Sequence, residues 1–192
     1  WVPDGSNELL GNNADVYADR DDNDAPDGAR VTGSPYRFFD QPVDLALYPD
    51  AYIPFSQVQG FYYLNAWHDW AYGLGFDEAA GNFQQDNFGR GGSGLDRLKL
   101  EVQNGGDLGF GWANQAWYTG FGDGFPGRIS VSVFGRSSPH RCGALDGVLL
   151  LHEATHGLTT RLVDDGYGLT KVQSRGMAEG WSDFFALSLL DA

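Results

Sequence analysis

Two histidines one helical turn apart, set in an apolar segment, constrain this chain more than any other feature. His152 and His156 lie within residues 148–162 (VLLLHEATHGLTTRL), enough for a buried helix of roughly three to four turns. Residues four positions apart share one face of a helix, so both imidazoles can reach a single metal ion. Glu153 lies about 100° further around the helix, beside the ion. Because neutral imidazole suits Zn²⁺, the segment predicts a zinc-binding helix with a carboxylate placed to act as a base.

A second motif supplies the further ligand that such a site needs. A catalytic zinc site has three protein ligands and one open position for water. Glu179 lies 23 residues past His156, where we expect a second apolar helix to begin. Asp183 follows one turn later on the same face, where it could accept a hydrogen bond from a zinc-binding histidine. The sequence therefore predicts Glu179 as the third ligand and Asp183 as a residue that orients a ligand.

Together the two motifs resemble those of the thermolysin-like gluzincins, and most of all those of the fungalysin family of secreted metallopeptidases. The likeness rests on HEATHGLTTRL and GMAEGWSDFFAL, with further agreement at residues 61–84 and 123–128. It implies that His152, His156 and Glu179 ligate zinc, that Glu153 is general base and acid, and that Asp183 supports His152. It also implies a secreted, extracellular enzyme that hydrolyses peptide bonds of extended protein substrates.

Two more roles come from the resemblance to thermolysin. Tyr167 lies at the distance from His156 where thermolysin carries a tyrosine that helps to hold the transition state. Fungalysins do not clearly keep that residue, and a turn residue between Gly166 and Gly168 is the alternative. Gln115, Ala116 and Trp117 would belong to an edge strand that pairs with the substrate backbone, or to an ordinary sheet edge.

Other functions stay open for the same motifs. A zinc aminopeptidase would share the three ligands, but such enzymes commonly carry a Gly-x-Met-Glu-Asn anchor ahead of the zinc helix, and the chain has none. In an extracellular binding module, zinc would only join two helices. Such a site needs no base like Glu153, and it usually has a fourth protein ligand. The pattern favours a zinc endopeptidase over both.

Charge and hydropathy exclude other partners. The net charge of −14 repels phosphate backbones, so we expect no nucleic acid partner. No apolar run approaches the length of a membrane span, and nothing at the start is typical of a signal peptide. We therefore expect no membrane partner, and a mature, processed form.

An oxygen-rich cluster near the amino terminus is a candidate calcium site. Asp19, Asp21, Asn23 and Asp27 lie in a turn-rich stretch, and their side chains carry the oxygen ligands that calcium prefers. The pattern is not an EF-hand, because Asp24 takes the place of the required glycine. Calcium and solvated turns both explain the cluster.

The pattern of apolar residues and turns predicts an α+β fold. We expect strands at residues 98–102, 115–118 and 129–134 and a buried helix at 56–74. The strands would form a twisted, mostly antiparallel sheet packed on the zinc helix, followed by the second ligand-bearing helix, as in a thermolysin-like zincin.

Residues 1–55 would form a turn-rich acidic segment, and residues 56–192 the amino-terminal part of a catalytic domain. In the thermolysin-like enzymes a further helical subdomain forms the other wall of the cleft. The resemblance therefore implies that a carboxy-terminal subdomain, or a separate chain, completes the cleft here.

Overall fold

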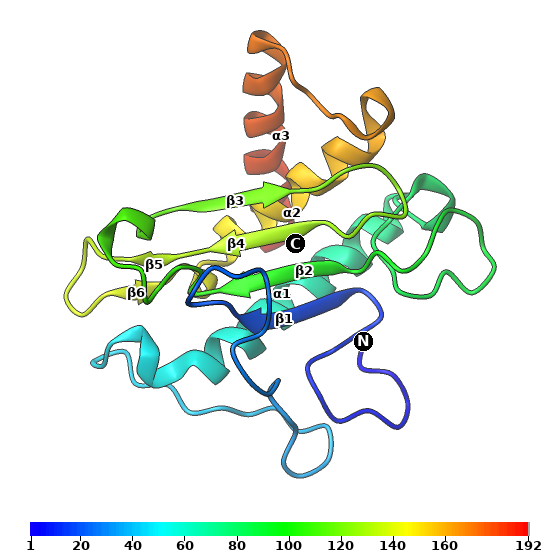
Figure 1. Ribbon diagram of the computed structural model, residues 1–192. Helices are drawn as coiled ribbons and strands as arrows, with labels where there is room; N and C mark the ends of the chain where they lie inside the picture. Colours follow the sequence, from blue (N-terminus) through cyan, green and yellow to red (C-terminus); the bar gives the residue numbers. More distant parts are fainter. Residues whose placement is uncertain (192) are drawn as a thin grey trace.

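A four-stranded sheet lies at the centre of the structure, a computed structural model that describes residues 1–191 (Figure 1). Its strands are, in spatial order, β1 (Ala14–Ala18), β2 (Leu98–Val102), β4 (Arg128–Val131) and β3 (Ala116–Thr119). Two short strands, β5 (Val133–Phe134) and β6 (Arg141–Cys142), form a second, antiparallel sheet. The strand predicted at 98–102 is confirmed, the one at 115–118 is shifted by one residue, and the one at 129–134 is divided between β4 and β5.

The central sheet is mixed, so the expectation of a mostly antiparallel sheet is wrong. β1 runs parallel to β2, and β2 runs parallel to β4, while β3 and β4 are antiparallel. The error arose because β1 lies in the turn-rich stretch where no strand was predicted. All five residues of β1 are buried, and a strand buried on both faces lacks the alternating pattern that identifies a strand in a sequence. A helix joins β1 to β2, and a crossover of this kind makes its two strands parallel.

Three helices build on this sheet. α1 (Ile53–Gly73) and α2 (Gly147–Leu162) lie behind the sheet, and α3 (Val172–Leu190) extends beyond its β3 edge (Figure 1). Single turns of 3₁₀ helix occur at Pro49–Tyr52, Glu78–Ala80, Phe110–Trp112, Gly143–Leu145 and Asp164–Gly166. Across the described residues, no helix is both long and apolar enough to span a membrane.

The helix ends follow from local hydrogen bonds. α2 begins where the Asp146 side chain accepts a hydrogen bond from the backbone N–H of Leu149, 3.2 Å away, as an N-cap does. α3 begins at Val172, and the Ser174 hydroxyl stabilises this end by accepting a hydrogen bond from the Lys171 N–H at 3.0 Å. The prediction that the second helix starts at Glu179 is therefore wrong. Glu179 lies in the interior of α3, which holds its side chain more firmly than a fraying end would.

The core fills the space between the sheet and the first two helices. Leu64 and Trp67 of α1, Leu150 of α2, and Leu100 and Ile129 of the sheet each expose at most 1% of their surface. Burial of such a side chain contributes roughly 1.5–3 kcal/mol. This packing fixes α2, and any group that it carries, relative to the strands.

Gly60 lets α1 approach β2 closely, which generates a stability prediction. A Cβ at Gly60 would lie 2.4 Å from Cδ2 of the fully buried Leu100. We expect Gly60→Ala to lower the free energy of unfolding in urea by about 1–3 kcal/mol, although alanine itself favours helix by about 1 kcal/mol. Gly73→Ala is the matched control, because open space surrounds a Cβ there. Equal stability of the two variants would contradict the tight approach.

Candidate metal centre

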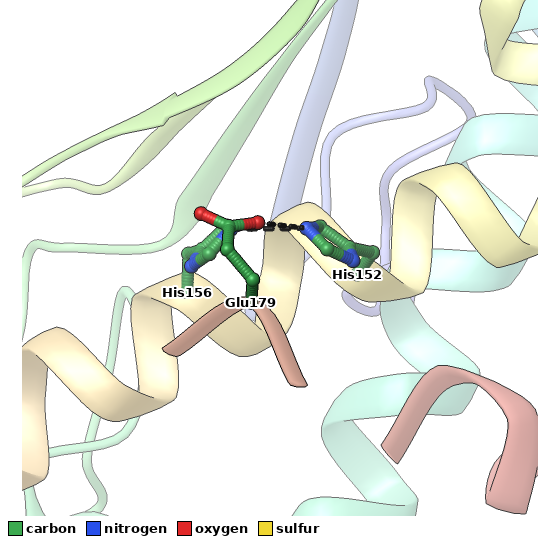
Figure 2. Close-up of side chains that lie close together, drawn as sticks. All are labelled: His152, His156 and Glu179. Atoms are coloured by element: carbon green, nitrogen blue, oxygen red, sulfur yellow. Dashed lines mark hydrogen bonds and ion pairs between the residues drawn. The ribbon is translucent and has the colours of Figure 1, made fainter. Parts of the chain in front are cut away.

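Three side chains from two helices converge beside the sheet. α2 presents His152 and His156 on one face, with their Nε2 atoms 3.0 Å apart. Glu179 reaches across from α3, and its Oε2 atom lies 3.1 Å from Nε2 of His152 and 3.4 Å from Nε2 of His156. Figure 2 shows the carboxylate pointing from its own helix toward both rings. Residues far apart in sequence thus present three donor atoms to one point.

The spacing of these donors fits a zinc ion. Ligands bound to Zn²⁺ at about 2.0–2.1 Å in a tetrahedron lie roughly 3.3 Å from one another. The three measured separations, 3.0, 3.1 and 3.4 Å, are of this size. Burial lowers the pKa of His156, which favours the neutral imidazole that binds metal. Two neutral imidazoles and one carboxylate are also a donor set that suits zinc.

Asp183 lies on the outer side of His152. Its Oδ1 atom is 2.8 Å from Nδ1 of His152, one helical turn beyond Glu179 on α3. A carboxylate there accepts the Nδ1–H proton, which leaves the Nε2 lone pair directed at the other two donors. The side chains of Glu179 and Asp183 are 63% and 66% exposed, so the site opens to solvent on the α3 side.

Glu153 occupies a different environment from Glu179. Its residue surface is only 6% exposed, and burial raises the pKa of its carboxyl to about 7. The nearby charge of His152 and a hydrogen bond from the backbone N–H of Tyr118 oppose this rise in pKa, while Glu179 adds to it. A cation held by the three donors would favour the carboxylate form. The group is thus adjacent to the site and can exchange a proton near neutral pH.

The contact with Tyr118 identifies the strand that borders this site. Tyr118 belongs to β3, the edge strand, which pairs with β4 on one side only. Ala116 and Trp117 lie in the same strand and Gln115 directly precedes it, so all three predicted substrate residues are at this edge. Sequence reasoning missed Tyr118, and no residue type could have revealed it, because the donor is a backbone N–H that every residue except proline carries.

Tyr167 is not brought into contact with the three donors. It follows the short Asp164–Gly166 turn, its backbone N–H bonds the carbonyl of Asp164 at 3.0 Å, and its residue surface is 74% exposed. Among the described residues, no hydrogen bond or ring contact connects its side chain to His152, His156 or Glu179. Its role in the transition state stays a prediction.

The acidic residues near the amino terminus form a compact turn. Fully buried Asp19 accepts hydrogen bonds from the backbone N–H groups of Asn23 and Asp24 at 2.9 and 3.0 Å. Asp21 accepts one from the Asn23 side chain, and Asp27 one from a backbone N–H. Carboxylate oxygens of Asp19, Asp21 and Asp27 lie within 4.8 Å of one another. Hydrogen bonds within the turn account for this clustering, and calcium binding stays a prediction.

Comparison with known proteins agrees with the metal-binding pattern. The family described as fungalysin metallopeptidase (M36) matches residues 1–191. The chain is 37% identical to the extracellular metalloproteinase mep of Aspergillus flavus, over 98% of this chain and 30% of that protein. It is 37% identical to extracellular metalloproteinase 4 of Arthroderma otae, over 95% and 27% of the two chains. It is 42% identical to the extracellular metalloproteinase mep of Aspergillus niger, over 73% and 22%. The chain therefore spans less than a third of the length of these relatives.

The 2.8 Å contact between Asp183 and His152 leads to a prediction about affinity. We expect Asp183→Ala to weaken zinc binding by about 10- to 100-fold in a competition titration with a chelator, because the ring loses the group that fixes its tautomer. Asp191→Ala removes an acid of the same helix region and should leave the affinity unchanged. Glu179→Ala shows the largest loss of affinity to expect, since it removes a donor atom and should abolish stoichiometric zinc binding. Parent-like affinity of Asp183→Ala would remove Asp183 from the site.

Proposed function

The chain belongs to the fungalysin family of metallopeptidases, and on this basis we propose that it carries the zinc centre of a secreted endopeptidase with a thermolysin-like fold. Its substrates would be extended segments of proteins. The observation that carries the proposal is the triangle of donor atoms from His152, His156 and Glu179 with the buried carboxyl of Glu153 beside it. Secretion is supported by the relatives, which are named extracellular metalloproteinases.

The proposal assigns the metal ligands and their support. His152, His156 and Glu179 would hold zinc, and Asp183 would keep His152 in the tautomer that binds. When bound, zinc would supply the Lewis acid that polarises a peptide carbonyl and lets water attack near neutral pH. Three protein ligands leave a coordination position open, whereas a purely structural site usually closes with a fourth. The buried base beside the donors likewise favours an enzyme over a zinc-stapled binding module.

Glu153 would move the proton in this reaction. Its carboxylate would take a proton from the attacking water and then deliver it to the nitrogen of the leaving amine. Burial raises the pKa of this carboxyl, and a cation at the three donors would favour its ionised form, in which it can accept the proton of the attacking water. The hydrogen bond from the Tyr118 N–H would hold one side of the carboxylate, so that its other side faces the reacting groups.

β3 would hold the substrate in an extended form. The strand pairs with β4 along one edge only, so its other edge offers backbone groups to which a peptide can add as a further strand. Of the predicted residues Gln115, Ala116 and Trp117, Gln115 already bonds Ser132 through both its backbone N–H and its carbonyl. Since backbone groups alternate between the two sides of a strand, Ala116 would supply the free groups. The Tyr118 N–H already contacts Glu153, so a peptide on this edge would lie beside the proposed base.

We further propose that another part of the protein, a carboxy-terminal helical subdomain or a separate chain, covers the outer side of α3. Met177, Trp181, Phe184 and Leu187 expose between 39% and 63% of their surface along this helix. A mainly apolar groove of about 340 Å³ continues the surface between α2 and α3, past Leu158. Exposed apolar surfaces of this kind mark interfaces. The relatives, more than three times as long as the matched region, have chain enough to form such a cover.

Substitution of the proposed base tests the function directly. We expect Glu153→Gln to keep stoichiometric zinc but to cleave an internally quenched peptide at least about 100-fold more slowly, because the amide cannot take up a proton. Zinc content and cleavage are measured on one sample and compared with those of the unsubstituted protein. Retained cleavage would eliminate Glu153 as the base, and activity restricted to free amino termini would indicate an aminopeptidase instead.

The proposed cover predicts that residues 1–192 by themselves are an incomplete enzyme. In the thermolysin-like enzymes the further subdomain supplies a histidine that stabilises the transition state, and loss of one such donor costs about 100- to 1000-fold in rate. The isolated chain should therefore bind one zinc ion yet cleave slowly. Turnover of about 10 per second or more by the monomeric chain, measured with the same quenched peptide, would refute this.

A further inference from the structure

Arg161, in the last turn of α2, donates five hydrogen bonds, all to residues outside α2. Its side chain is 0% exposed. Nη1 donates to the carbonyl of Gly81 at 2.8 Å, to that of Asn82 at 3.1 Å and to the Asp96 carboxylate at 2.9 Å. Nε donates to the carbonyl of Phe121 at 3.1 Å, and Nη2 donates to that of Phe125 at 2.7 Å. Four of these five acceptors are backbone carbonyls of loops. The guanidinium thus connects the zinc helix to two loops that are remote from it in sequence.

One of these loops is the segment that leaves β3. Residues 120–127 connect β3 to β4, and the carbonyls of Phe121 and Phe125 both accept from Arg161. Asp96, the ionic partner of Arg161, holds the same segment by accepting from the backbone N–H of Gly124 at 2.9 Å. Asp123, within the segment itself, is a second ionic partner of Arg161 at 3.5 Å. The segment that follows β3 is therefore tied to the end of α2 through Arg161 and its two carboxylate partners.

A stack of rings extends this connection to the strand itself. The guanidinium carbon of Arg161 lies 4.0 Å from the centre of the Phe83 ring, and that ring packs edge-on against Tyr118 with centroids 6.4 Å apart. A Cβ at Gly157 would lie 2.9 Å from the Phe83 ring and 3.0 Å from the Tyr118 ring. α2 therefore touches both rings with no side chain in between, one turn after Glu153.

We propose that Arg161 is a positioning residue, which sets the distance between β3 and α2 so that the backbone of Tyr118 meets Glu153. The inference rests on the proposed function, because the relevance of this distance depends on β3 and Glu153 acting on one substrate. A misplacement of about 1 Å can cost about 100-fold in rate. A buried ion pair adds little to stability compared with apolar residues of the same volume, which agrees with a geometric role for Arg161.

Two variants test this from different directions. Arg161→Lys keeps a charge for Asp96, but a lysine has one nitrogen and cannot reach the separate carbonyls that the guanidinium fork binds. Phe83→Leu leaves the ion pair intact and removes the ring between it and Tyr118, so the test survives if Arg161→Lys fails to fold. Arg30→Lys is the control, because Arg30 makes a comparable two-bonded pair with Asp15, at 2.8 Å and 2.8 Å, on the opposite edge strand.

The decisive measurement is hydrogen exchange of the backbone amides in the zinc-loaded chain. We expect the Tyr118 amide to exchange at least about tenfold faster in Arg161→Lys and Phe83→Leu, with the amides of β2 within about twofold of the parent and zinc content unchanged. Where the parent cleaves peptide, kcat should fall by about 10- to 100-fold in both variants and stay unchanged in Arg30→Lys. Parent-like exchange of Tyr118, or equal acceleration across β2 and β3, would overturn the inference. A parent that binds no zinc would count against the proposed function. A parent that binds zinc but does not cleave would agree with the missing cover proposed above, and the exchange result would still decide, because it does not require activity.

Discussion

The packing of α2 between the sheet and α3 is the constraint on which the rest of the structure depends. One face of the helix contributes Leu150 and Leu151 to the core, and a neighbouring face turns His152 and His156 toward α3. The two helices must pack closely for Glu179 to reach both rings. Small residues make this possible, because Ala178, Ser182 and Ala186 are the buried positions of α3.

α2 buries two charged side chains, Glu153 beside the metal donors and Arg161 in its last turn, and burial has a different consequence for each. Near the donors, burial raises the pKa of Glu153 and gives it a proton affinity that an exposed glutamate lacks. At the end of the helix, every nitrogen of the buried Arg161 guanidinium donates a hydrogen bond, and its charge is paired with Asp96, so this group serves to hold geometry. One helix therefore carries both a group suited to proton transfer and a group that holds its surroundings in place.

The edge strand β3 connects these two features. Its backbone contacts Glu153 at Tyr118, and its continuation is the loop that Arg161 holds. An edge strand is normally an exposed row of unpaired donors and acceptors that invites association. Here that edge lies next to the donor triangle, where binding of an extended peptide would place its backbone close to the base.

The sequence by itself determined the features that depend on short separations along the chain. The i, i+4 spacing predicted that His152 and His156 share a face, and the same rule related Glu179 to Asp183, because helix geometry is local. The helices at 56–74 and 148–162 and the strand at 98–102 were predictable from periodicity for the same reason. The tertiary structure alone decided the parallel pairing of β1 with β2, since a buried strand in a turn-rich segment has no local signature. It also decided that the N–H of Tyr118 meets Glu153 and that Arg161 binds loops far away in sequence, because backbone groups and long-range packing distances leave no pattern in the order of residues.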